Sequence, residues 1–260
     1  MTSEAATPHP EAVLFAVEEV LVPVETPRAW QWAWRPQGPV LGERHLQTVL
    51  RRGRRAWDSR RWLGLTGRAS SADALAFSDH LAETLRALAG HALPPGETEA
   101  VVRRVQHPTG EVERFSEVPP LLERLGAAGV RCGAVSSLTE ENARWVMHRT
   151  GLADSLLLSA GDPPGPSVPA PEALRAAAER LGVGRDRTAF VGGLYWSDVR
   201  AAHRAGLRAI LVDRAGAWPH VQAGRLTSLQ GLEEALRSVQ GPPSGPEEGP
   251  ADETGPVGRP

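Results

Sequence analysis

Apolar and polar residues in the second half of the chain follow two alternating patterns. Short runs that are almost wholly apolar predict buried strands, and each is followed by a segment whose apolar residues recur every three or four positions, as on one face of a helix. An earlier apolar run, starting at Ala12, predicts a first strand that leads into a loop. The later predicted strands are 130–135, 155–159, 188–193 and 208–213. The predicted helices are 119–129, 138–151 (with Thr139 as N-cap), 171–182, 197–206 and 229–239.

This alternation over short connections is typical of an α/β fold with a parallel sheet covered by helices on both faces. The stretch 26–115 differs, because it has helical periodicity and no run typical of a strand. We therefore predict an α/β core over 11–25 and 116–240, with an α-helical domain of residues 26–115 inserted after the first strand. The ends, 1–10 and 241–260, are rich in Pro, Gly and acid and are predicted to be disordered.

Composition narrows the function classes only slightly. A chain of 260 residues with 41% hydrophobic content can bury a core, and its formal net charge of -2 predicts no obligatory nucleic-acid or membrane partner. No apolar run reaches the roughly 18–20 residues that span a bilayer, and the N-terminal residues lack the features of a secretory signal. We therefore expect a cytoplasmic protein. The lone Cys132 is expected to be a buried, unreactive thiol. All 29 basic residues are arginine, which removes any chemistry that needs a lysine amine.

Four segments near the ends of predicted strands carry the candidate chemistry. In chain order they are AVLFAVEEV, GAVSSLTEEN, SVPAPEALRAAAERL and FVGGLYWSDVRAAHRAGLRAILVDR. In their order, their spacing and the position of the helical insertion, they resemble the haloacid dehalogenase (HAD) superfamily of phosphohydrolases. The resemblance covers nearly all of the chain between its predicted disordered ends. It implies a Rossmann-like three-layer core, whose motifs meet at the carboxyl ends of the strands, and an inserted α-helical cap.

The first motif of that superfamily is an apolar strand ending in Asp-x-Asp, in which the first Asp attacks phosphorus and the second transfers protons. By the resemblance, the nucleophile position is Ala16 and the acid/base position is Glu18. A methyl group cannot attack phosphorus, and the extra methylene of Glu18 moves its carboxyl by more than about 1 Å, a costly displacement in catalysis. Glu19 stands where the family prefers glycine, and two glutamates there disfavour an anion.

The other three motifs are only partly intact. Ser136, followed by Ser137, fits the second motif, whose Ser or Thr donates a hydrogen bond to phosphate. The lysine of the third motif falls on Val168, and the first acid of the Mg²⁺-binding pair in the fourth motif falls on Gly193. The second acid survives as Asp198, which also suits a helix start, where a carboxylate accepts backbone N–H groups.

Together these substitutions predict a pseudoenzyme with a HAD-like fold that acts as a binding, regulatory or structural protein. Losing a nucleophile alone can cost about 10⁴ to 10⁶ in rate, and the countercharge and an Mg²⁺ ligand are lost with it. We expect no cofactor, because too few oxygen ligands remain for Mg²⁺. Ser136, Ser137 and Asp198 are the candidate ligand-binding residues. The alternative is an unorthodox hydrolase with residual activity through Glu18 or Asp198.

Two segments of the predicted cap are candidate binding surfaces. RRGRRAWDSRRW fits a polyanion- or nucleic-acid-binding module, but the acidic net charge and the lack of a nucleic-acid motif favour a solvated helix. Its arginines are Arg51, Arg52, Arg54, Arg55, Arg60 and Arg61. In WQWAW, we expect Trp30, Trp32 and Trp34 to pack the cap onto the core, with docking of an unidentified protein partner as the alternative.

Overall fold

The structure is a computed structural model that describes residues 9–23, 27–36, 40–65, 77–106, 113–138, 140–160, 170–221 and 224–239. The described residues form two compact units. An α/β unit is built from residues within 1–23, 112–214 and 218–244, and a helical unit is built mainly from residues within 24–111.

A parallel sheet forms the centre of the α/β unit. Its six strands among the described residues have the order β3-β2-β1-β4-β5-β6. Their bounds are Ala12–Ala16 (β1), Arg131–Ser136 (β2), Leu157–Ala160 (β3), Thr188–Gly192 (β4), Arg208–Val212 (β5) and Arg225–Leu226 (β6). All of β1 is buried, because it pairs with β2 on one side and β4 on the other and is covered on both faces. The register places Ala16 beside Val135.

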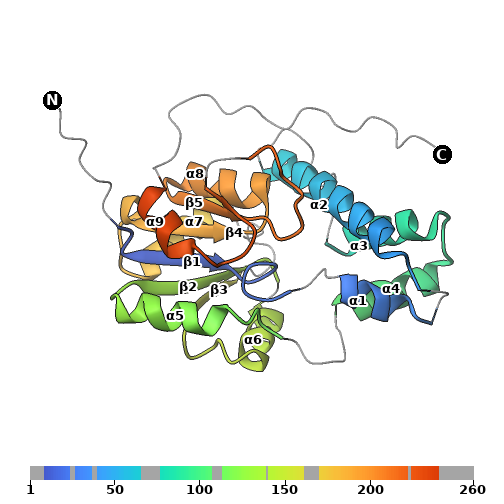
Figure 1. The fold of residues 1–260 in the computed structure, drawn as a ribbon, viewed down its shortest axis with the longest axis horizontal. Helices are drawn as coiled ribbons and strands as arrows, with labels where there is room; N and C mark the ends of the chain where they lie inside the picture. The colour runs from blue at the N-terminus through green and yellow to red at the C-terminus, as the bar shows by residue number, and fades with distance from the viewer. Residues whose placement is uncertain are drawn as a thin grey trace. The chain divides into compact units, whose positions relative to one another are not determined.

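Helices cover both faces of this sheet. Figure 1 shows α5 and α6 on one face and α7 and α8 on the other, the arrangement that right-handed crossovers produce. The bounds are Val118–Ala127 (α5), Glu140–Arg149 (α6), Pro171–Arg180 (α7), Arg185–Arg187 (η1), Tyr195–Arg200 (η2), Ala201–Ala205 (α8) and Leu232–Ser238 (α9). An ion pair of 2.9 Å between Arg124 and Glu233 joins α5 to α9.

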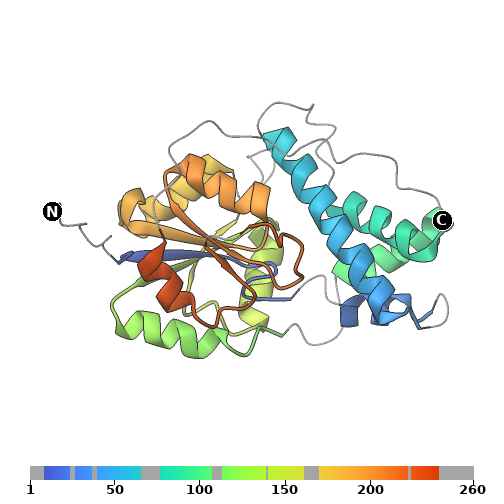
Figure 2. The ribbon, with the colours of Figure 1, turned by 45° about the horizontal axis from the view of Figure 1, so that its top comes forward.

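The helical unit has a hydrophobic core of its own. Its helices are Pro27–Trp34 (α1), Glu43–Leu65 (α2), Phe77–Ala89 (α3) and Pro95–Gln106 (α4). Leu46, Leu81 and Val101 contribute side chains to this core from three of the helices. The long α2 lies against α3 (Figure 2), and Gly53 allows the close approach, because a Cβ atom there would lie 2.9 Å from the Thr84 hydroxyl.

The predicted fold class, an α/β core with a parallel sheet and an inserted helical region, is confirmed. The structure differs in two details. It adds β6, which is too short to leave a sequence pattern, and the helix predicted at 197–206 begins earlier, with the π-helix η2. The Val199 N–H bonds to the Leu194 carbonyl, five residues before it, at 3.2 Å, which widens this turn. Thr139 and Val168 lie outside the described residues. No helix in the described ranges is long and apolar enough to cross a membrane.

Candidate functional site

The loop after β1 is a tight turn closed by its own backbone. The N–H groups of Leu21 and Val22 donate to the Val17 carbonyl at 3.1 and 3.0 Å, and the Glu19 N–H donates to the Val22 carbonyl at 2.8 Å. Glu19 has a φ of 65°, and no other non-glycine residue in the described part of the chain has a positive φ. This conformation costs a residue with a Cβ atom about 1 kcal/mol. The loop is therefore shaped for glycine at position 19, and its surroundings must hold the glutamate there.

Arg214, which directly follows β5 and Asp213, braces this loop. Its Nε donates to the Glu19 carbonyl at 3.2 Å and its Nη2 donates to the Val20 carbonyl at 3.1 Å. Its Nη1 forms an ion pair of 2.8 Å with Glu117, and its guanidinium carbon lies 3.5 Å from the centroid of the Phe115 ring. The sequence pattern did not identify Arg214, Glu117 or Phe115 as site residues. One side chain thus links the end of β5, the loop after β1 and the start of α5.

The Glu117 carboxylate is stabilised in its charged form by this brace. Burial raises its pKa, but hydrogen bonds from its own backbone N–H and from Arg214, the charge of Arg214, and a hydrogen bond from the Leu229 backbone together lower the pKa below its ordinary value of 4.5. The Glu117–Arg214 ion pair is mostly buried, so it is screened less than a surface pair.

The loop after β1 brings the Glu18 carboxylate to the end of β2. The Ser136 hydroxyl donates to Oε1 of Glu18. The Ser137 backbone N–H donates to Oε2 at 3.2 Å, and the Ser137 hydroxyl lies 3.5 Å from the same oxygen. Ser136 is fully buried and also accepts the Leu138 N–H at 3.1 Å. Two of the three candidate ligand-binding residues therefore lie together, and their donors contact a carboxylate of the chain itself.

The third candidate, Asp198, lies at the end of β4. Its Oδ2 accepts the Gly193 N–H at 2.8 Å and the Leu194 N–H at 3.0 Å, and the side chain is only 4% exposed. Gly192 makes room for it, because a Cβ atom there would lie 2.9 Å from the same Oδ2. The carboxylate closes the turn between β4 and η2, a position in which a carboxylate commonly caps backbone N–H groups.

The HAD resemblance implies a magnesium ion, which requires oxygen ligands. A Cβ atom on Gly193 would lie 3.6 Å from the Glu18 carbonyl oxygen and 3.3 Å from Glu19 Cβ, so this position faces the loop after β1 but supplies no carboxylate. Ala16, at the end of β1, supplies only a methyl group. No three or more His, Cys, Asp or Glu side chains in the described ranges are grouped so that they could hold a metal ion. The residues present do not fit Mg²⁺.

The arginines of the candidate polyanion-binding segment lie in different environments along α2. Arg51 and Arg52 are exposed, whereas Arg54 and Arg61 are buried. Arg60 is bound in a bidentate ion pair with Glu83 of α3, at 2.6 and 3.2 Å. Arg55 is half-buried, and the Arg61 guanidinium carbon lies 5.2 Å from the centroid of the Trp57 ring. The six side chains therefore do not form one exposed basic face.

The tryptophans of the WQWAW segment are also divided between buried and exposed positions. Trp30 and Trp34 are buried in the core of the helical unit, whereas Trp32 is 37% exposed. This division follows from α1 being a helix, in which residues four apart share a face and the residue between them points away. Trp32 is therefore the one tryptophan of the three that stays available for contact with a partner.

Burial raises the pKa of the Cys132 thiol to about 12, which keeps it protonated and unreactive.

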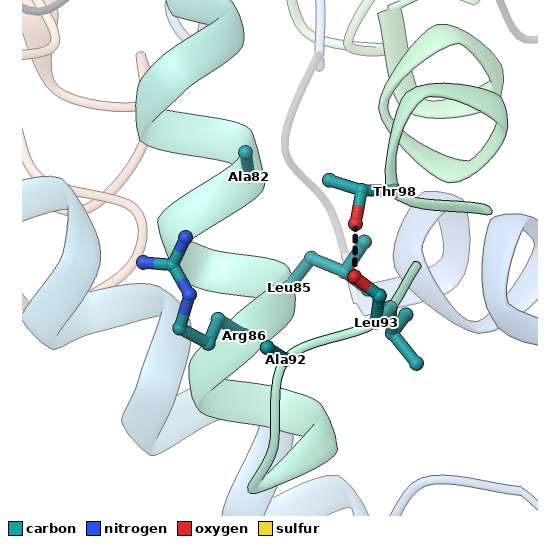
Figure 3. Close-up of a pocket in the computed structure, with 6 residues that line it drawn as sticks. All are labelled: Ala82, Leu85, Arg86, Ala92, Leu93 and Thr98. Carbon is teal, nitrogen blue, oxygen red and sulfur yellow. Dashed lines mark hydrogen bonds between the residues drawn. The ribbon is translucent and has the colours of Figure 1, made fainter. Parts of the chain in front are cut away.

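A pocket lies in the helical unit between the end of α3 and the start of α4 (Figure 3). Its empty volume is about 230 Å³, and the Thr98 hydroxyl donates to the Leu93 carbonyl at 3.5 Å at its edge. Its lining residues are Ala82, Leu85, Arg86, Ala92, Leu93 and Thr98. Its lining has no carboxylate, and its one hydroxyl, that of Thr98, is bound to a backbone carbonyl, so the pocket adds no candidate chemistry.

Comparisons with known proteins agree with this fold. A model of the haloacid dehalogenase-like hydrolases matches residues 3–206. Phosphoglycolate phosphatase of Rhodospirillum rubrum is 34% identical over 94 residues, a match that covers 36% of this chain and only 39% of that protein. The crystal structure of an L-2-haloacid dehalogenase has a TM-score of 0.64 at 21% identity, covering 89% of this chain and 100% of that chain. A dehalogenase crystallised with an intermediate complex has a TM-score of 0.63 at 20% identity, covering 88% and 98%. The chain belongs to the haloacid dehalogenase-like hydrolase family.

Proposed function

We propose that this chain is a pseudoenzyme of its family, which binds, regulates or supports another molecule and does not hydrolyse a substrate. The observation that carries this proposal is the contact between the Glu18 carboxylate and the donors of Ser136 and Ser137. By the resemblance, Ser136 would hold a substrate phosphate, and here its proton goes to the protein's own carboxylate.

Two further observations support the proposal. At the end of β1, where the family has its nucleophile, Ala16 carries a methyl group that cannot attack phosphorus or carbon. At the end of β4, Gly193 provides no carboxylate, and the surviving acid, Asp198, accepts two backbone N–H groups of its own turn. Each acid that the motifs retain is thus engaged in holding a loop.

The alternative is an unorthodox hydrolase of the same fold. It is motivated by the family, since relatives are named as a phosphatase and a dehalogenase, and by the partial exposure of Glu18, which leaves that carboxylate accessible for proton transfer. A cytoplasmic location remains our expectation for either function, and cell fractionation tests it.

The two functions are separated by turnover. We would measure Mg²⁺-dependent release of phosphate from a panel of phosphate monoesters, and of halide from 2-haloacids. The natural protein is compared with a restored variant carrying Ala16→Asp, Glu18→Asp, Glu19→Gly, Val168→Lys and Gly193→Asp. Glu19→Gly is included because the new Asp side chain at position 193 would otherwise crowd Glu19.

We expect no turnover by the natural protein and phosphate release by the restored variant. The matched control is the same variant with Ala16→Asn in place of Ala16→Asp, which has nearly the same shape but no nucleophile and should be inactive. Metal-dependent turnover by the natural protein above that of the control contradicts the pseudoenzyme proposal and establishes the alternative.

A further inference from the structure

The donors at the end of β2 form a small site for an oxyanion. The Ser136 hydroxyl and the Ser137 N–H reach different oxygens of one carboxylate, and the Ser137 hydroxyl lies 3.5 Å from the second oxygen. We propose that this is an oxyanion-binding site whose permanent occupant is the Glu18 side chain, so that the natural protein excludes phosphate and similar small anions from it. The inference rests on the proposed non-hydrolytic function. It assigns a new role to the site that, by the resemblance, would hold a substrate phosphate.

The direction of the Ser136 proton supports this assignment. The hydroxyl oxygen accepts the Leu138 N–H at 3.1 Å, and the hydroxyl has one proton to donate, which goes to Oε1 of Glu18. Ser136 is fully buried with the Glu18 side chain in place, so the carboxylate shields this donor from solvent. Without the Glu18 carboxylate, a buried donor and a neighbouring backbone N–H would both need a new acceptor, and a buried donor left without one is unfavourable.

The loop after β1 holds the occupant in place. Glu19 adopts its strained left-handed conformation between Glu18 and the carbonyls that Arg214 binds. A tethered carboxylate of this kind competes with free anions at a high effective concentration, typically on the order of millimolar or above. Dissolved phosphate would have to displace it and leave a carboxylate beside itself, which disfavours exchange.

The Glu18 side chain can be truncated without breaking the hydrogen bonds that close the loop after β1. The loop backbone is closed by hydrogen bonds among Val17, Leu21 and Val22 that do not involve the Glu18 side chain. The side chain is half-buried, so its truncation opens a site that solvent and small anions can reach. Glu18→Ala is therefore expected to expose the three donors while the loop keeps its conformation.

The test is binding of inorganic phosphate to the full-length chain, followed by ³¹P NMR titration and by the thermal unfolding midpoint, with sodium chloride at the same ionic strength as reference. Glu18→Ala and Glu18→Ser should bind phosphate at least about tenfold more tightly than the natural protein, a difference of about 1.4 kcal/mol. The natural protein should show no saturable binding over the phosphate concentrations at which these variants saturate. Adding Ser136→Ala to Glu18→Ala should abolish the gain.

Two matched controls distinguish exclusion of phosphate by the volume of the Glu18 side chain from exclusion by its negative charge. Glu18→Gln removes the charge but keeps the volume, so it should leave phosphate excluded. Glu19→Gly removes an equal charge from the neighbouring residue and leaves Glu18 in place, so it should also show no binding. Circular dichroism verifies that each variant is folded.

Two outcomes would overturn the inference. One is that the natural protein, or Glu18→Gln, binds phosphate as tightly as Glu18→Ala does. The other is that neither Glu18→Ala nor Glu18→Ser binds phosphate although both are folded. None of these is a turnover measurement. Failure here therefore leaves the pseudoenzyme proposal intact, whereas phosphate release by the natural protein overturns that proposal without a binding titration.

Discussion

Two carboxylates hold loops at neighbouring strand ends of the sheet, and they do so in different ways. Asp198, after β4, is almost fully buried and accepts two backbone N–H groups at 2.8 and 3.0 Å, with Gly192 making room for it. Glu18, after β1, is half-buried and binds one backbone N–H and two hydroxyl groups. The difference shows that an acid at a strand end can be part of the fold, as Asp198 is by accepting the N–H groups of its own turn, or can fill a ligand site, as we infer for Glu18.

The largest effect that this comparison predicts is on stability at position 198. Asp198→Ala leaves two backbone N–H groups of a buried turn without an acceptor and should lower the free energy of unfolding by about 3 kcal/mol, whereas Glu18→Ala should lower it by about 1 kcal/mol. Urea unfolding of both variants measures the difference. Asp198→Asn is the matched control, because it keeps an acceptor oxygen of the same shape and should recover most of the loss. Equal losses at positions 18 and 198 would mean that both acids serve the fold alike.

A smaller effect is expected where the two strand ends face each other. A side chain at position 193 starts 3.3 Å from Glu19 Cβ, closer than such atoms normally approach. Gly193→Asp should therefore destabilise the chain by about 1–2 kcal/mol through crowding and by placing an acid beside Glu19. In a double-mutant cycle, Glu19→Gly should remove about half of that cost. Additive effects of the two substitutions would show that the positions do not interact.

Glu19→Gly alone should stabilise the protein. The left-handed conformation at φ 65° costs a residue with a Cβ atom more than it costs glycine, and the expected gain of about 1 kcal/mol is reduced by the greater freedom of glycine in the unfolded chain. Thermal or urea unfolding gives the value. Glu19→Asn is a useful intermediate, since asparagine tolerates this conformation better than glutamate. A loss of stability with glycine would mean that the Glu19 side chain contributes more than its backbone costs.

The sequence predicted the strands that lead to these acids, because short and almost wholly apolar runs such as AVLFA and TAFVG are typical of buried strands. It also placed Ser136 at a strand end, since that position follows directly from where the run stops. It did not reveal that Ser136 binds Glu18, because the two residues are 118 positions apart and meet only through pairing of β1 with β2.

For the same reason, the sequence did not reveal that Arg214 binds the loop after β1. Arg214 contacts Glu19, 195 positions earlier, and nothing in the local pattern around either residue indicates it. The tryptophans of α1 stand at alternate positions in the sequence and are easy to notice. Because α1 is a helix, however, Trp30 and Trp34 share a face and Trp32 points away, so the three side chains do not form one surface.

The smallest predicted effect is a loss of stability at acidic pH, caused by protonation of Glu117. The folded pKa of Glu117 is lowered below its ordinary 4.5, so this group binds its proton less readily in the folded state than in the unfolded state. Its contribution to stability is therefore complete above about pH 5 and is lost as the pH falls through the folded pKa. Since Arg214, its partner, holds the Glu19 and Val20 carbonyls, the loss should loosen the loop that carries Glu18.

Urea unfolding of the natural protein and of Glu117→Gln between pH 7 and pH 3 tests this. The gap in unfolding free energy between the two should be constant in the upper part of the range and shrink below pH 4.5. Amide exchange of the loop after β1, measured alongside, should rise in the natural protein over the same interval and stay flat in the variant, where the ion pair is already absent. If the difference in unfolding free energy instead widens in acid, the sign of the pH dependence is the reverse of the expected one. The Glu117–Arg214 ion pair would then not explain how the loop that carries Glu18 is held.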